Sequence, residues 1–123
     1  NANPGSLHAA IDVLMSYPNK KMLILGDMKE LGEDAKLFHH QAGAYAKNAG
    51  VDYVLAVGEF SQDVVDGFGD DAFAFKNKAD LCEHLNRLIA EHALMSVLVK
   101  GSLSMKMGEV VTYLLELKRE KCS

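Results

Sequence analysis

The stretch Lys21–Gly32 reads Lys-Met-Leu-Ile-Leu-Gly-Asp-Met-Lys-Glu-Leu-Gly and changes character halfway along. Its first half is a continuous apolar run, which is typical of a strand buried on both faces, as in a parallel sheet. Its second half is a glycine-containing loop that carries the carboxylates of Asp27 and Glu30. Because ligands bind beyond the carboxyl ends of strands in open parallel sheets, this stretch predicts a central strand that ends at a ligand site.

Short apolar runs of the same kind recur along the chain. Besides the strand at Lys21–Gly26, strands are predicted at Tyr53–Val57, Ala72–Phe75 and Ser96–Val99. The second strand ends at Gly58 and the fourth at Lys100-Gly101-Ser102, so glycine-containing turns follow three of the four strands.

Between these strands, apolar residues recur at helical spacing. Ser6, Asp34 and Asn77 are the residue types that cap helix N-termini, and Gly50 is placed as a C-terminal glycine. The apolar stripes span Leu7–Met15, Phe38–Ala49, Phe60–Phe68, Leu81–His92 and Met107–Leu115. Alternating strands and helices predict an α/β fold, namely a three-layer Rossmann-like domain with a mainly parallel sheet flanked by helices. At 123 residues, we expect residues 1–123 to form one domain.

Composition and charge exclude several classes of protein. Hydrophobic residues make up 49% and charged residues 24% of the chain, as in ordinary globular proteins. A net charge of -4 gives no basic footprint for nucleic acid. No apolar run approaches the roughly 20 residues that a membrane span needs. Cys82 and Cys122 have no metal-ligand spacing, so we expect reduced cysteines and no metal site.

The sharpest chemical feature is Lys100-Gly101-Ser102. A cation, a flexible backbone and a hydroxyl precede an expected helix N-terminus, where free N–H groups favour anions. The phosphate-binding pattern G-x-x-x-x-G-K-[ST] is absent from the chain, so a carboxylate, or a phosphate supplied by another domain, fits this corner. The alternative is a solvated Lys100 beside an ordinary serine cap.

The loop after the first strand offers carboxylates instead. Asp27 and Glu30 could hold an ammonium group, a ribose or a hydrated metal, and the alternative is that both are solvated loop residues. His39 lies on the face of the next helix from which it could pack or hydrogen-bond toward this loop. No nucleophile constellation is visible, so no catalytic residue is predicted.

Three motifs in order and in register resemble those of the Mur ligase family, in the C-terminal domain of its D-alanyl-D-alanine-adding branch. The resemblance covers essentially the whole chain. The motifs are Asn1-Ala2-Asn3-Pro4-x-Ser6, Leu25-Gly26-Asp27-Met28-x-Glu30-Leu31-Gly32 with His39 downstream, and Val99-Lys100-Gly101-Ser102-x-Ser104-Met105-Lys106-Met107.

The resemblance implies a bacterial, cytoplasmic, three-domain amide ligase that depends on ATP and Mg²⁺. The N-terminal domain would hold the UDP-sugar, and the central domain would carry the P-loop and the magnesium ligands. The C-terminal domain would close over ATP and bring in D-alanyl-D-alanine. The carboxylate of UDP-MurNAc-tripeptide would become an acyl phosphate, which the dipeptide amine attacks. This chain would then be an excised domain, inactive alone, within an enzyme expected to be a monomer.

Carried over by position, the resemblance places Asn1 and Asn3 on the nucleotide side of the domain entrance. It places Asp27, Glu30, His39 and the segment Lys100-Gly101-Ser102 on the dipeptide side. The family usually has an acidic residue and a tyrosine just before the position of Asn1, where this sequence begins. It also often has arginine where Leu103 stands, so a guanidinium contact is not expected there.

Two other readings remain open on the sequence. The first is a stand-alone regulatory or binding module for a nucleotide or small acid. The absence of a starting methionine favours a piece of a longer enzyme over that module, and an upstream P-loop in the parent reading frame would decide between them. The second is a related ligase of the folate-polyglutamate type, which the combination of Leu-Gly-Asp-Met and Lys-Gly-Ser disfavours.

Overall fold

The computed structural model describes residues 3–92 and 94–122, with side chains up to residue 117. Within these residues, five helices alternate with four strands, and two short 3₁₀ turns, η1 and η2, follow the first and last strands. In chain order the elements are α1 (Pro4–Leu14), β1 (Lys20–Gly26), η1 (Gly32–Asp34), α2 (Ala35–Ala49), β2 (Tyr53–Val57), α3 (Ser61–Phe68), β3 (Ala72–Phe75), α4 (Lys78–Glu91), β4 (Met95–Lys100), η2 (Leu103–Met105) and α5 (Gly108–Cys122).

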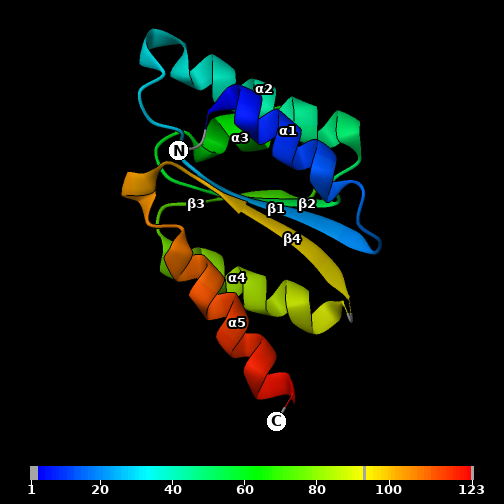
Figure 1. The fold of residues 1–123 in the computed structure, drawn as a ribbon. Coiled ribbons are helices and arrows are strands. Elements are labelled where there is room, and N and C mark those ends of the chain that lie inside the picture. Colours follow the sequence, from blue (N-terminus) through cyan, green and yellow to red (C-terminus); the bar gives the residue numbers. More distant parts are fainter. Residues whose placement is uncertain (1–2, 93, 123) are drawn as a thin grey trace.

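The four strands form one sheet in the order β3-β2-β1-β4, and every neighbouring pair is parallel (Figure 1). Strand β1 is central, and Leu25 pairs with Ala56 on one side and with Lys100 on the other. From Met22 onward β1 is buried, as the apolar run predicted. The predicted three-layer α/β fold is therefore confirmed, and the parallel order brings the carboxyl ends of the strands to one edge.

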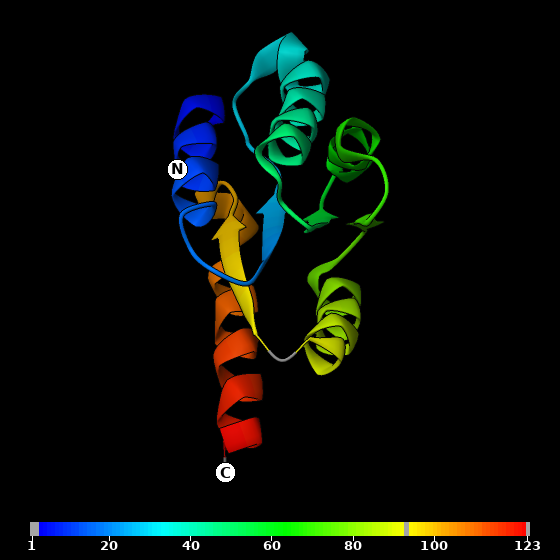
Figure 2. The ribbon, with the colours of Figure 1, turned by 90° about the vertical axis from the view of Figure 1, so that its right-hand side faces the viewer.

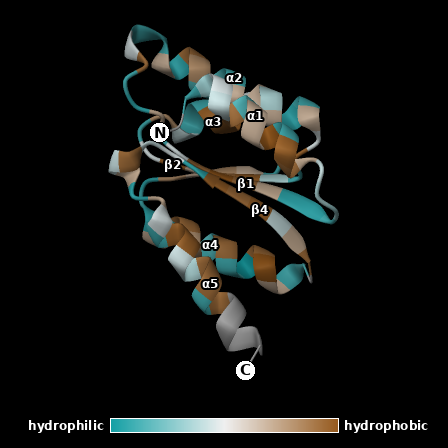
Figure 3. Cartoon of the chain, in the orientation of Figure 1, coloured by the Kyte–Doolittle hydropathy of each residue, from teal (hydrophilic) through white to brown (hydrophobic). Residues whose placement is uncertain are grey.

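Helices cover both faces of this sheet, with α1, α2 and α3 on one face and α4 and α5 on the other (Figures 1 and 2). Alternate residues of β1 serve the two layers, because successive strand side chains point to opposite faces. Leu23 and Leu25 pack with Leu7 and Ile11 of α1, whereas residues such as Ile24 face the other layer. The hydropathy colouring shows these apolar strands enclosed between the helical layers (Figure 3).

The start of α1 differs from its prediction. Asn3, rather than Ser6, is the N-cap: its side-chain oxygen accepts a 2.9 Å hydrogen bond from the Ser6 N–H, and Ser6 Oγ accepts one from the Asn3 N–H. Proline suits the first helical position because its missing N–H would have no partner there. The helix therefore begins at Pro4, in a reciprocal capping box.

The second layer also departs from prediction at two places. His92 lies beyond the end of α4 with an extended backbone, and its Nε2 is 3.0 Å from the Tyr53 hydroxyl instead of continuing the helical stripe. Helix α5 does not directly follow Ser102, because η2 and a left-handed Lys106 intervene. Asn77 caps α4 as predicted, since its side chain accepts a 2.8 Å hydrogen bond from the Asp80 N–H.

Helix α5 leaves the body of the molecule as it proceeds (Figure 1). Val111 and Leu115 were predicted to belong to its apolar stripe, yet they are exposed by 40% and 61%. Within the described ranges, no helix has the length and apolarity that crossing a membrane requires.

The described part of the chain holds one buried side-chain polar atom without a partner, Nε2 of His84 on α4. The His84 ring lies 4.3 Å from the ring of Phe73, measured between centroids. Burial first, and the charge of Arg87 second, lower the pKa of His84 below its ordinary value, while Glu91 opposes them. The unfolded chain therefore binds a proton at this site more readily than the folded chain does.

We expect His84 to make the fold sensitive to mild acid. The pKa of His84 in the unfolded chain is near 6.5. Above that pH the residue is neutral in both states, so it does not lower the free energy of unfolding. As the pH falls below 6.5 toward the lowered folded pKa, the unfolded state is favoured and the free energy of unfolding decreases. Urea unfolding at a series of pH values should show this decrease in the wild type and a smaller one in His84→Phe. The same series on His40→Gln, at an exposed position, controls for the loss of a histidine; an unchanged profile in His84→Phe would contradict the assignment.

Candidate functional site

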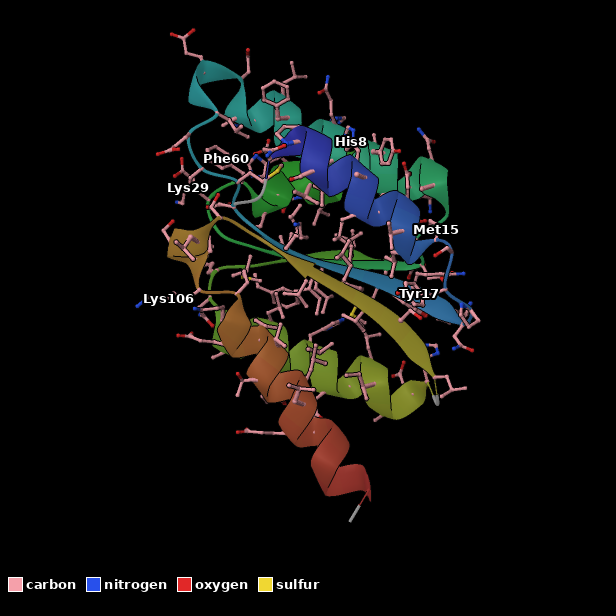
Figure 4. The ribbon with its side chains drawn as sticks, viewed as in Figure 1. His8, Met15, Tyr17, Lys29, Phe60 and Lys106 are labelled. Atoms are coloured by element: carbon pink, nitrogen blue, oxygen red, sulfur yellow. The ribbon has the colours of Figure 1, made fainter. Side chains whose placement is uncertain are left out.

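The loops that follow β1 and β4 are joined at the carboxyl edge of the sheet. The Ser102 N–H donates to the Asp27 carbonyl at 3.0 Å, and the Lys29 N–H donates to Ser102 Oγ at 2.6 Å. Ser102 is only 7% exposed, so the main role of its hydroxyl is to connect the two loops by this hydrogen bond. Figure 4 shows Lys29, Phe60 and Lys106 at this end of the molecule, with Met15 and Tyr17 at the other.

Gly101 allows the two loops to approach this closely. A Cβ atom at this position would lie 2.7 Å from Cγ of Met107 and 3.3 Å from the Cα of Gly26. Real side chains do not tolerate the first distance, so any larger residue would displace the methionine beneath the loop. The glycine in Lys100-Gly101-Ser102 is thus explained by packing, independently of any ligand.

The Asp27 side chain lies in the interior of the site, with 3% of it exposed. Its two oxygens accept hydrogen bonds from the Glu59 N–H at 2.8 Å and the Phe60 N–H at 3.0 Å. These N–H groups precede α3, so the carboxylate satisfies donors that lack partners at the start of a helix. Lys29 Nζ approaches the same carboxylate at 3.8 Å. Asp27 therefore binds the loop after β2, in addition to any contact with a ligand.

Gly58, at the end of β2, makes room for this carboxylate. Its φ is +123°, a conformation that other residues rarely adopt, and a Cβ there would lie 2.5 Å from the Asp27 carboxyl group. The acidic loop and the second glycine turn, which the sequence placed at the same edge, are hence directly in contact.

His39 ties the acidic loop to α2. Its Nε2 accepts a 3.0 Å hydrogen bond from the Met28 N–H, and its Nδ1 donates to the Ala35 carbonyl at 2.7 Å. Because Nε2 accepts and Nδ1 donates, the ring is the neutral tautomer with its proton on Nδ1. The ring also stacks on Phe60 at 4.7 Å and is 1% exposed. His39 thus supports the loop through Nε2, while its Nδ1 bonds within α2 and fixes the orientation of the ring.

Glu30 is the acidic loop residue with a different environment. It is exposed, its φ is +63°, and it forms no ion pair with any side chain that the structure describes. A left-handed backbone is unfavourable for glutamate, and such strain is often found at functional loops. Of the two loop carboxylates, Glu30 is the one that remains available to a ligand.

Lys100 lies at the end of β4, half-buried, beside a pocket of about 290 Å³ that Ser102, Leu103 and Lys106 also line. Its ammonium has no ion-pair partner among the described carboxylates. The pocket combines two cations with a hydroxyl and with the exposed side chain of Leu103, 83% of which is accessible. An anion site at Lys100-Gly101-Ser102, which the sequence predicted, stays a prediction.

The predicted nucleotide-side residues are separate from this pocket. Asn3 is exposed, and its side-chain oxygen is used as the cap of α1. Helix α1 nevertheless begins at the same end of the molecule as the loops described above (Figure 1). Asn1 lies outside the described residues.

No group of three His, Cys, Asp or Glu side chains within residues 3–92 and 94–117 is arranged to hold a metal ion. Asp27 and His39, the two buried polar residues of the acidic loop region, already hydrogen-bond to the backbone.

Sequence reasoning missed Lys29, Phe60 and Lys106 at this edge. Lys29 and Phe60 each lie within two residues of a glycine or carboxylate that the sequence did single out, and that proximity was the signal available in advance. Lys106 lies within the quoted motif that runs from Val99 to Met107, but no role was predicted for it. Their contacts, such as the stacking of Phe60 on His39, join elements far apart in the sequence.

Comparison with known families gives a match over most of the chain. The family described as "Mur ligase, glutamate ligase domain" matches residues 1–103. UDP-N-acetylmuramoyl-tripeptide–D-alanyl-D-alanine ligase of Escherichia coli K12 is 44% identical over 94% of the chain. The ligase of the same name from Bacillus subtilis 168 is 34% identical over 94%. The chain spans 25% and 26% of these two relatives, about a quarter of their length.

Solved structures give the same result. A crystal structure of MurF from Acinetobacter baumannii has a TM-score of 0.89 and 34% identity, covering 94% of this chain and 26% of that one. MurF ligase from Thermotoga maritima, determined in complex with ADP, has a TM-score of 0.78 and 25% identity. It covers 100% of this chain, which corresponds to 28% of the Thermotoga chain.

Proposed function

The chain belongs to the Mur ligase family, and we propose that it is the C-terminal domain of a ligase that adds D-alanyl-D-alanine to UDP-MurNAc-tripeptide in peptidoglycan precursor synthesis. The relatives that bear this name match nearly the whole chain. The observation that carries the assignment to this substrate lies at the edge of the sheet, where Lys100 ends β4 and the exposed Glu30 follows the adjacent β1. Lys100 has no ion pair with any side chain that the structure describes.

A dipeptide offers one carboxylate and one amine, and this edge offers a partner for each. We assign the carboxylate to Lys100 and the pocket beside it, because a lysine forms charge-assisted hydrogen bonds with carboxylate oxygens. We assign the amine side to the acidic loop, where Glu30 is accessible. Asp27, His39 and Ser102 then hold the two loops in place, since their polar atoms bond to the loop backbones.

In the proposed reaction, the terminal carboxylate of UDP-MurNAc-tripeptide attacks the γ-phosphate of ATP, which gives an acyl phosphate and ADP. The dipeptide amine then attacks the acyl carbon, phosphate leaves, and UDP-MurNAc-pentapeptide is formed. This chain would close over ATP and orient the amine. The P-loop and the Mg²⁺ that neutralises the phosphate charge would belong to the central domain, and the UDP-sugar to the N-terminal domain. We further propose a cytoplasmic, monomeric enzyme.

The direct test is an assay of the full-length protein with UDP-MurNAc-tripeptide, D-alanyl-D-alanine and ATP. We expect ADP release that depends on the dipeptide and a pentapeptide product by mass spectrometry. ADP release that does not depend on the dipeptide, or that requires a different amine, would overturn the proposed substrate.

The isolated 123-residue chain is expected to hydrolyse ATP at no measurable rate. The physical reason is that the phosphates and the metal would be held by a different domain, so the reacting groups are not brought together. Release of phosphate can be measured with the chain alone and with the full-length protein at equal molar concentration. Sustained turnover by the chain alone would contradict the proposed division of labour between domains.

A further inference from the structure

Two lysines, six residues apart in the sequence, line the pocket at the end of β4. Lys100 ends the strand, and Lys106 ends the 3₁₀ turn that follows it. The chain as a whole carries a net charge of -4, so two cations on one pocket form a local excess of positive charge. Like charges on one small pocket repel each other, and an anion between them would relieve that repulsion.

Neither lysine is neutralised within the described part of the structure, where neither forms an ion pair. Glu109, in the first turn of α5, is the acidic residue nearest in sequence, but it is held by Lys78 at 2.5 Å. The hydrogen bond and the charge of Lys78 are the main causes of the lowered pKa of Glu109, and Lys106 is a lesser one. Glu109 therefore has a partner of its own.

The backbone of Lys106 points to a role for its side chain. Its φ and ψ are 51° and 45°, the left-handed region in which glycine and asparagine are common and lysine is not. The Lys106 N–H donates to the Leu103 carbonyl at 3.1 Å, which closes the turn. Figure 4 shows the Lys106 side chain extending outward from this turn, at the end of the molecule where Lys29 and Phe60 also lie.

We propose that Lys106 supplies a second cation to this pocket, so that Lys100 and Lys106 together hold the oxygens of one carboxylate or phosphate group. This proposal rests on the proposed function, in which the edge faces an anionic substrate. It adds a binding residue at a position where the neighbouring exposed residue, Leu103, carries no charge. The anion comes either from the dipeptide carboxylate or from the nucleotide phosphates, and kinetics can separate the two.

The test replaces Lys106 in the full-length ligase. Lys106→Asn removes the charge but keeps a residue that tolerates the left-handed backbone, and Lys106→Arg keeps the charge. We expect Lys106→Asn to raise one KM about three- to tenfold and Lys106→Arg to change it little. A rise in the KM for D-alanyl-D-alanine identifies a carboxylate as the anion, and a rise in the KM for ATP identifies a phosphate.

Two further variants make the result specific to the pocket. Leu103→Arg, combined with Lys106→Asn, should restore the lost affinity, because position 103 lines the same pocket and is exposed. Lys76→Asn serves as the matched control, since Lys76 is an exposed lysine that follows β3, at the far end of the strand order. Unchanged KM values in Lys106→Asn would overturn the role of Lys106, and so would a rise of the same size in the KM of Lys76→Asn. Either result would leave the proposed function standing. A wild-type enzyme without dipeptide-dependent turnover would instead overturn the proposed function and this inference with it.

Discussion

Replacing Lys100 by alanine in the full-length ligase is expected to raise the KM for D-alanyl-D-alanine about ten- to a hundredfold. A hydrogen bond to a charged group contributes roughly 1.5–3 kcal/mol, which corresponds to a change of this size in affinity. Lys100 is half-buried and has no ion pair with a described residue, so its charge is available to a bound carboxylate. Steady-state kinetics with the dipeptide as the varied substrate measures the effect.

The matched control for this experiment is Lys21→Ala. Lys21 is also half-buried and lies on the adjacent strand, but near the amino end, where it pairs in register with Ser96. We expect Lys21→Ala to leave the KM for the dipeptide within about twofold of the wild type, because an interaction worth less than 0.5 kcal/mol changes affinity little. A dipeptide KM and kcat that do not change in Lys100→Ala would refute the role of Lys100.

Asp27→Ala should destabilise the 123-residue chain by about 2–5 kcal/mol, because each donor left without its acceptor costs roughly 1–3 kcal/mol. The substitution removes the acceptor of the Glu59 and Phe60 N–H groups, both at the start of α3. It also leaves a space between Gly58 and the loop that the carboxylate now fills. The free energy of unfolding can be measured in urea.

Asp52→Ala provides the comparison for Asp27→Ala. Asp52 also accepts a hydrogen bond from a strand backbone, the Lys21 N–H at 2.8 Å, but its side chain is 33% exposed. Water can replace that acceptor, so we expect a loss of only about 1 kcal/mol. If the two variants were equally stable, the hydrogen bonds of the buried Asp27 carboxylate would contribute no more to stability than that of the more exposed Asp52.

These experiments separate two kinds of residue at one edge. Lys100, Lys106 and Glu30 present side chains that the described structure leaves without ion pairs. Asp27 and His39 use their polar atoms on loop backbones. Mutation of the first group should change affinity with little change in stability, whereas mutation of the second should change both.

Local sequence patterns were sufficient for the succession of strands and helices. The apolar run in Lys21–Gly26 predicted a strand buried on both faces, and β1 is the central strand of the sheet. Asn77 and Gly50 were placed as caps by residue type alone, and both have those roles. Such features depend on neighbours within about four residues, which a sequence displays directly. The cap of α1 was misassigned to Ser6 because both members of a capping box are good caps.

The sequence by itself determined the α/β class, the edge where the loops gather, and the residue types that lie there. Only the tertiary structure decided which of those residues are already engaged. Asp27 accepts hydrogen bonds from the backbone after β2, 32 and 33 residues further along the chain. His39 accepts one from the backbone after β1, 11 residues earlier in the chain. The strand order, and with it the loops that become neighbours, fixes these partners. Burial then requires each polar group to be satisfied, so the fold assigns Asp27 and His39 to support and leaves Lys100, Lys106 and Glu30 accessible to a ligand.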